Sequence, residues 1–179
     1  FAKQFTKLSY AFMNKKQADE LVDFSRISAN VFNRFILGKA LDSLIIGIIT
    51  YIVLSIINVP FALLLSLIIG VTNMIPVFGP FIGAVPGIFI LFIIDPIMVV
   101  WFVLFVLVIQ QIDGNIIGPA ILGDSLGLPT LWIMFAIVVG GGFFGILGMF
   151  FGVPVFAVIY LYIKKATERR LLHKNIEIE

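Results

Sequence analysis

The stretch that decides the fold is "NMIPVFGPFIGAVPG", Asn73–Gly87, which separates two apolar runs. Those runs, "FALLLSLII" before it and "IFILFII" after it, would otherwise favour helix. The breakers inside the stretch are Pro76, Gly79, Pro80, Gly83, Pro86 and Gly87. Because proline removes a backbone donor and glycine weakens a helix, breakers at this density predict that a helix ends within an apolar part of the chain.

The composition indicates an integral membrane protein. Hydrophobic residues make up 61% of the chain and charged residues 12%, whereas a soluble domain is about half apolar and about a quarter charged. Between Lys39 and Lys164 the sequence has no lysine, arginine or histidine. The acids in that interval are Asp42, Asp95, Asp113 and Asp124. The apolar segments are continuous rather than alternating, so we expect an all-α polytopic bundle and not a barrel.

Charge divides the chain into three parts. Residues 1–39 carry seven lysines or arginines against three acids, with apolar residues at helical spacing, and are expected to form a basic amphipathic helical arm. The arm would lie on the membrane surface or dock on its own protein. Residues 40–163 form the predicted transmembrane core, and residues 164–179 a basic tail. The positive-inside rule places both termini in the cytoplasm of a multi-pass cell (inner) membrane protein. Because the chain begins at Phe1 inside a patterned helix, we expect it to be the C-terminal part of a longer protein.

The core contains six apolar segments, most of them short for a membrane span. They are residues 40–57, 60–73, 80–94, 96–112, 129–145 and 148–163. A full span needs about 20 residues, and only 40–57 and 96–112 approach that length. Either six helices cross the membrane, or two cross while the remaining segments pair as re-entrant hairpins.

The second break is "GGGFFGILGMFFGVP", Gly140–Pro154. Together with the first break it suggests a binding site, because interrupted helices at corresponding places in a transporter point to one near the midplane. Glycine-mediated helix packing is the simpler alternative for the glycines, but it does not need the prolines. We expect the two tips to approach one another near Asp113 and Asn115, with Asn73 on the first tip and Pro76 and Pro80 ending its first arm. The remaining residues of this broken-helix motif are Pro119, Gly141, Gly145, Gly148 and Pro154.

The third feature is "QQIDGNIIGPAILGD", Gln110–Asp124. Gln110, Gln111, Asp113 and Asn115 are expected to end an apolar helix and to offer oxygen ligands with one titratable charge, which suits a proton or small cation. The alternative is an ordinary loop at the interface. Asp95 fits a turn, and Asp42, close to Lys39, is expected at the interface.

These three motifs, in this order, resemble the C-terminal core of the AI-2E family, the autoinducer-2 exporter or PerM-like permeases. The matching pattern runs from Ile75 and Pro76 through Asp113 to Pro154. Members of the family usually have glutamate where this chain has Asp113. The resemblance implies transport, described in the family either as export of autoinducer-2 or as Na⁺(Li⁺)/H⁺ antiport. It also implies a homo-oligomer, with a pentamer as the expected form.

The expected function is therefore secondary transport, out of the cell, of autoinducer-2 or another small neutral solute. The absence of a phosphate-binding GxxxxGK[ST] motif points to an ion gradient, H⁺ or Na⁺, as the energy source. Antiport of Na⁺(Li⁺) and H⁺ and a non-transporting membrane scaffold are the alternatives. An aspartyl protease is excluded, because Asp95 and Asp113 lie about 27 Å apart at the ends of one helix. No enzyme activity, cofactor, metal or nucleic acid is expected.

Overall fold

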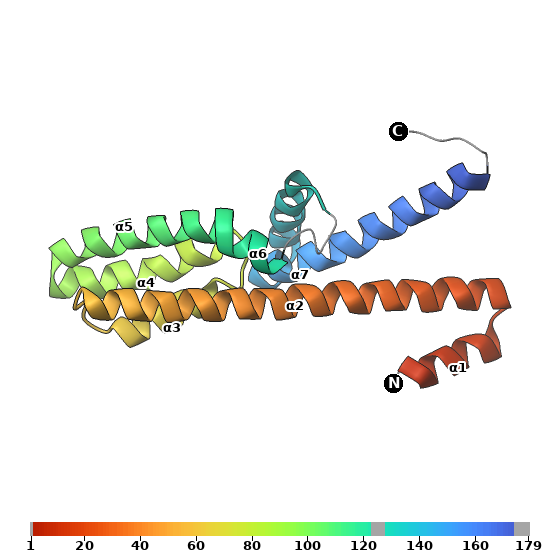
Figure 1. The fold of residues 1–179 in the computed structure, drawn as a ribbon, viewed down its shortest axis with the longest axis horizontal. Coiled ribbons are helices and arrows are strands. Elements are labelled where there is room, and N and C mark those ends of the chain that lie inside the picture. Colours follow the sequence, from red (N-terminus) through yellow and green to blue (C-terminus); the bar gives the residue numbers. More distant parts are fainter. Residues whose placement is uncertain (1, 123–127, 174–179) are drawn as a thin grey trace.

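The computed structural model describes residues 2–122 and 128–173, and the regular structure in them is helical. In chain order the elements are α1 (Ala2–Phe12), α2 (Lys15–Ile56), α3 (Ala62–Thr72), α4 (Gly79–Ile94), α5 (Pro96–Ile112), the π-helix η1 (Asp113–Ile117), α6 (Gly118–Leu122) and α7 (Thr130–His173). With 42 residues, α2 is about 63 Å long and runs the whole length of the molecule (Figure 1). The start of α2 and the end of α7 lie at the same end of the molecule.

Within the described parts of the chain, three segments are long and apolar enough to cross a membrane. They are Lys15–Ile56, Pro96–Ile121 and Leu131–Glu168, whereas α3 and α4 are shorter. The predicted all-α polytopic fold is therefore confirmed. The clean span expected at 96–112 lies inside the second of these segments, and the one expected at 40–57 lies inside the first except for its last residue, Ile57. The third corresponds to the predicted broken pair, and the turn at Gly145 divides it.

The first break forms a short helical hairpin. Helix α3, about 16 Å long, ends at Thr72, and a turn leads into α4, which is about 24 Å long. Pro76 lies in the turn, but the prediction that Pro80 ends the first arm is wrong. Pro80 stands in the first turn of α4, where the missing N–H of a proline has no helical partner to lose.

The glycines of this hairpin let its two arms touch. A Cβ on Gly79 would lie 1.9 Å from the carbonyl oxygen of Thr72, and one on Gly83 would lie 2.3 Å from Thr72 Oγ1. Gly87 packs against the ring of Phe102 on α5. The expected close packing of the second arm along this glycine face is therefore present.

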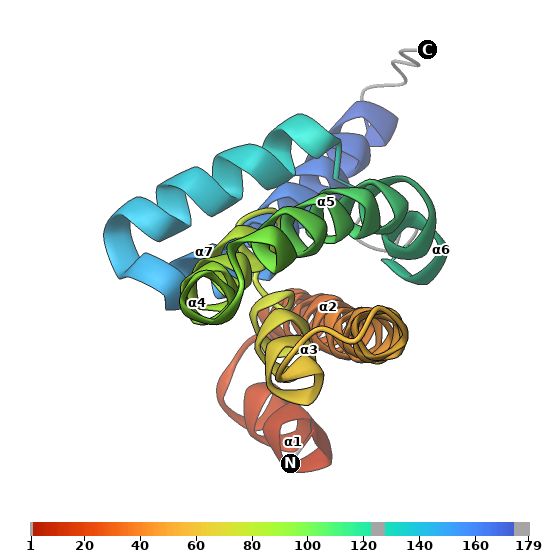
Figure 2. The same ribbon diagram turned by 90° about the vertical axis from the view of Figure 1, so that its left-hand side faces the viewer.

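The second break is a hairpin inside α7. At Gly145 the backbone takes φ 60° and ψ −142°, a conformation that glycine adopts without steric cost. The arms before and after it run at an angle to each other (Figure 2). They meet where Gly140 lies against Gly148 and Gly152. Pro154 lies in the second arm.

Helix α2 is shared by two apolar clusters. Its C-terminal half packs with α3, α4 and α5, around Ile46, Leu54 and Phe102. Its N-terminal half packs with α7, around Phe35 and Val153. The two halves of the described chain are therefore joined mainly through α2. This helix runs without a break across residue 39, where the basic arm was expected to end.

Polar and aromatic contacts fasten the outer end of α2. Lys165 Nζ donates to Asp23 Oδ2 at 2.5 Å, and the rings of Phe24 and Tyr162 meet edge to face. On the other side the Tyr10 hydroxyl of α1 bonds to Asp19 of α2. The first helix of the basic arm thus docks on α2.

Candidate functional site

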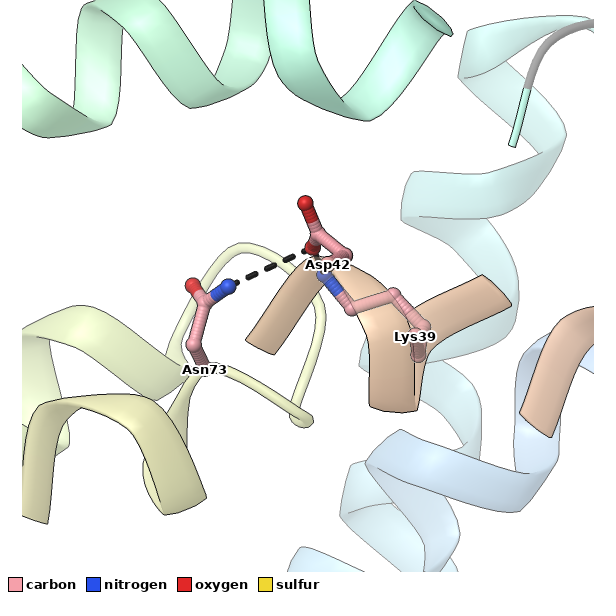
Figure 3. Close-up of polar contacts among 3 residues, drawn as sticks. All are labelled: Lys39, Asp42 and Asn73. Atoms are coloured by element: carbon pink, nitrogen blue, oxygen red, sulfur yellow. Dashed lines mark hydrogen bonds and ion pairs between the residues drawn. The ribbon is translucent and has the colours of Figure 1, made fainter. Parts of the chain in front are cut away.

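A buried polar cluster lies where the tip of the first hairpin meets the middle of α2. Lys39 and Asp42 stand three residues apart on α2, so they share one face of the helix, and Asn73 follows the last residue of α3. Asp42 Oδ2 accepts from Lys39 Nζ at 2.5 Å and from Asn73 Nδ2 at 3.3 Å (Figure 3). Their exposed fractions are 6% for Lys39, 0% for Asp42 and 2% for Asn73. The hairpin tip is thereby tied to the long helix through a charged group.

Asp113 is the fourth member of this cluster. It is buried at the start of η1, and its side chain interacts with those of Asp42 and Asn73, with the charge of Lys39 also within range. In Figure 3 the second oxygen of Asp42 points away from Lys39 and Asn73, toward the ribbon of α5 and η1. Within the described residues, Oδ1 of Asp42 and Oδ1 of Asp113 are both buried without a hydrogen-bond partner. Since unmet buried acceptors are costly, the two oxygens mark a place suited to a proton or a cation.

The chain does not end its helix at this point, contrary to the prediction. Instead α5 continues through η1 into α6, and the N–H of Gly118 bonds to the carbonyl oxygen of Asp113, five residues back. Pro119 has no N–H and its ring crowds the carbonyl four residues earlier. A π turn accommodates this defect without breaking the helix, and such turns are frequent at functional sites.

The predicted polar group Gln110–Asn115 is split by this continued helix. Gln111 and Asn115 are exposed, and Asn115 Nδ2 donates at 2.7 Å to the carbonyl oxygen of Gln111. Gln110 is half-buried, and its Nε2 has no hydrogen-bond partner within the described residues. Of the five predicted binding residues, the structure therefore brings Asp113 and Asn73 together and leaves Gln111 and Asn115 on the outer surface.

Two residues of the cluster were missed by sequence reasoning. Asp42 was expected at the interface, but it is fully buried in the protein. Lys39 was counted with the basic arm, so the core was thought to lack a base, whereas its side chain is only 8% exposed. The available signal was their i, i+3 spacing at the start of an interval that is almost free of charge.

The second hairpin does not reach the cluster. Its tip carries the exposed side chains of Phe143 and Phe144, and α7 packs chiefly on α2. The expectation that the two tips meet near Asp113 and Asn115 is therefore wrong for this chain. A cavity of about 570 Å³ lies along the hairpin instead, lined by apolar side chains such as Val139, Leu147 and Val155.

The fold and the cluster define a class: a multi-pass helical membrane protein with a short broken hairpin that closes on buried charged groups. The chain belongs to the AI-2E family of transporters. The sequence model of that family, described as "AI-2E family transporter", matches residues 2–168. It is therefore a member of a transporter family and not an enzyme.

Individual relatives support the assignment. The Bacillus subtilis protein named "Putative transport protein YrrI" is 44% identical over 125 residues, which are 70% of this chain and 35% of that protein. YueF, of the same organism and designation, is 37% identical over 68% of this chain and 33% of its own length. The "AI-2 transport protein TqsA" of Escherichia coli is 28% identical over 74% of this chain and 39% of its own length. The chain thus spans about a third of the length of the curated relatives it matches. No solved structure matches it.

Proposed function

We propose that this chain carries the coupling site of a secondary transporter that moves autoinducer-2 or another small neutral solute out of the cell. The single observation that carries the proposal is the buried pair Asp42 and Asp113, each with an unpaired carboxylate oxygen. Buried carboxylates are expensive unless a proton or a cation compensates their charge. Reversible occupation of this pair by H⁺ or Na⁺ is a simple way to couple solute movement to an ion gradient.

The position of the pair supports coupling to a conformational change. Asp42 belongs to the long helix α2, Asn73 to the tip of the α3–α4 hairpin and Asp113 to the π turn of η1. An ion bound between the carboxylates would therefore stabilise one arrangement of three separate elements. Binding that favours one conformation over another shifts the population toward it, which is what alternating access requires.

Charge and one relative favour a neutral cargo. Lys39, the base in the cluster, is already held by Asp42, so an anionic solute would find no free side-chain cation there. A neutral polar solute fits this arrangement better. The Escherichia coli relative TqsA is named as an AI-2 transport protein, which supports autoinducer-2 as the first cargo to test.

Antiport of Na⁺(Li⁺) against H⁺ is the second candidate, and the same acid pair favours it. Two carboxylate oxygens and a neighbouring asparagine amide resemble the oxygen-rich surroundings that a small hard cation prefers. In that mechanism a proton and a metal cation would occupy the pair alternately, and no organic solute would be needed.

We further propose that both termini face the cytoplasm and that the protein forms a homo-oligomer, with a pentamer as the expected form. Apart from the buried Lys39, the other eleven lysines and arginines flank the core, which supports the orientation. A membrane transporter contacts lipid and solute, and the large exposed apolar side chains of α4, α5 and α7 suit lipid or further copies of the chain.

Flux measured in proteoliposomes containing the full-length protein separates these functions. Autoinducer-2 uptake driven by an imposed H⁺ or Na⁺ gradient would support the first proposal. Na⁺ or Li⁺ flux that moves protons without any organic solute would support the antiporter. If neither flux exceeds that of empty liposomes, transport is refuted and the scaffold alternative gains support.

A further inference from the structure

The charge of the buried cluster can be counted group by group. Among the described residues its charged members are Lys39, Asp42 and Asp113, and the hairpin tip contributes the neutral amide of Asn73. Asp95 lies at the other end of α5, where its side chain caps the helix by accepting from the N–H of Ile97. One positive and two negative groups therefore share the cluster.

Lys39 cancels one of the two negative charges directly. Its Nζ lies 2.5 Å from Asp42 Oδ2, and both side chains are almost completely buried. A buried ion pair of this kind is close to neutral as a unit. Asp113 has no cation of its own, so the three groups together leave an excess of one negative charge.

We propose that Lys39 fixes the net charge of this site at minus one, so that it binds one monovalent cation, such as Na⁺ or Li⁺, and rejects a divalent cation. The inference rests on the proposed function and specifies the ion that the site takes. A monovalent cation between the free oxygens of Asp42 and Asp113 makes the site neutral. A divalent cation would leave one excess positive charge in surroundings of low dielectric, where unmatched charge is costly.

Thermal unfolding of the full-length protein in detergent tests this selectivity for a monovalent cation, because a ligand that binds only the folded state raises the Tm. NaCl or CaCl₂ is added to a choline chloride background at constant ionic strength. For the unsubstituted protein, Na⁺ should raise the Tm and Ca²⁺ should not. Lys39→Met keeps a long side chain but removes its charge, which leaves a net charge of minus two. Ca²⁺ should then raise the Tm, with an affinity increased on the order of a hundredfold.

A rescue experiment separates the charge of Lys39 from a purely structural role. Asp42→Asn leaves Lys39 and Asp113 with no net charge, so stabilisation by Na⁺ should be lost. The double variant Lys39→Met/Asp42→Asn returns the site to minus one and should recover stabilisation by Na⁺, without Ca²⁺ binding. If the two residues only supported packing, the second substitution would add damage and rescue nothing. The comparison of Asp42→Asn with the double variant keeps the test decisive if Lys39→Met alone fails to fold.

Specific results would overturn the inference. They are an absence of Na⁺ stabilisation in the unsubstituted protein, equal stabilisation by Na⁺ and Ca²⁺, or a double variant that responds no better than Asp42→Asn. Failure of the proposed function looks different: the cation pattern follows the charge count, but liposomes show no flux. The site would then bind a monovalent cation without driving transport.

Discussion

Asn73 Nδ2 lies 3.3 Å from Asp42 Oδ2, so a hydrogen bond joins the tip of the α3–α4 hairpin to the middle of α2. Both side chains are buried, and the acceptor already receives the ammonium group of Lys39. A bond to a charged group in such surroundings contributes about 1.5–3 kcal/mol. The hairpin tip is therefore held where the proposed ion site needs it.

Asn73→Ala is expected to lower transport about tenfold, because the tip loses this bond and Asp42 loses a donor. The measurement is the initial rate of gradient-driven flux in proteoliposomes. Asn115→Ala is the matched control, since Asn115 is exposed and its side chain bonds within its own helix. Equal losses in the two variants would show that the buried contact has no special role.

Asp113→Asn should abolish ion-coupled flux while leaving expression and assembly intact. The amide keeps the shape of the side chain but removes the charge that the proposed ion compensates. Asp113→Glu retains the charge, so substantial activity should remain. Near-normal flux in Asp113→Asn would contradict coupling at this position.

Gly148→Ala should destabilise the protein, because the added Cβ would lie 1.9 Å from the carbonyl oxygen of Gly140. Overpacking of this kind typically costs about 1–3 kcal/mol, and a lowered Tm in detergent would report it. Gly142→Ala, in the same hairpin, is the control. A Cβ there meets no heavy atom within 4 Å, so the Tm should stay the same or rise.

Cysteines introduced in place of Lys16 and Lys174 should remain unlabelled by a membrane-impermeant thiol reagent in intact cells. Residues 1–179 contain no native cysteine, so within them the label reports these two positions alone. Both should label once the membrane is permeabilised. Labelling of either position in intact cells would contradict the proposed cytoplasmic location of that end.

Much of the fold followed from the apolar pattern, because membrane spans and their breaks are local properties of the sequence. The hairpin at Asn73–Gly87 and the turn at Gly145 were visible as clusters of proline and glycine. The role of Pro80 was misjudged because proline both follows a helix and begins one. Continuation of α5 through a π turn depends on a backbone bond between Gly118 and Asp113 that composition does not reveal.

The site was only partly predictable. Asp113 and Asn73 stood out as polar residues beside apolar runs, and the structure brings them together. A helix continued through Asn115 would have predicted that Gln111 and Asn115 lie apart from Asp113. Gln111 and Asn115 are four residues apart and share one face of a helix, whereas each is two residues from Asp113 and so lies on the nearly opposite face. Lys39 and Asp42 looked like a surface pair, and their burial results from tertiary packing of α3 and α6 on α2, which no local pattern encodes.

The length of α2 has a mechanical consequence. Asp42 lies about 40 Å along the helix from Lys15, whereas the hydrocarbon layer is only about 30 Å thick. If α2 moves as a rigid rod, a tilt of roughly 10° about Asp42 would displace its Lys15 end by about 7 Å. Small movements at the buried carboxylates would then be amplified at the Lys15 end of α2, which carries α1 and the ion pair with Lys165. A spectroscopic probe at Lys16 would detect them.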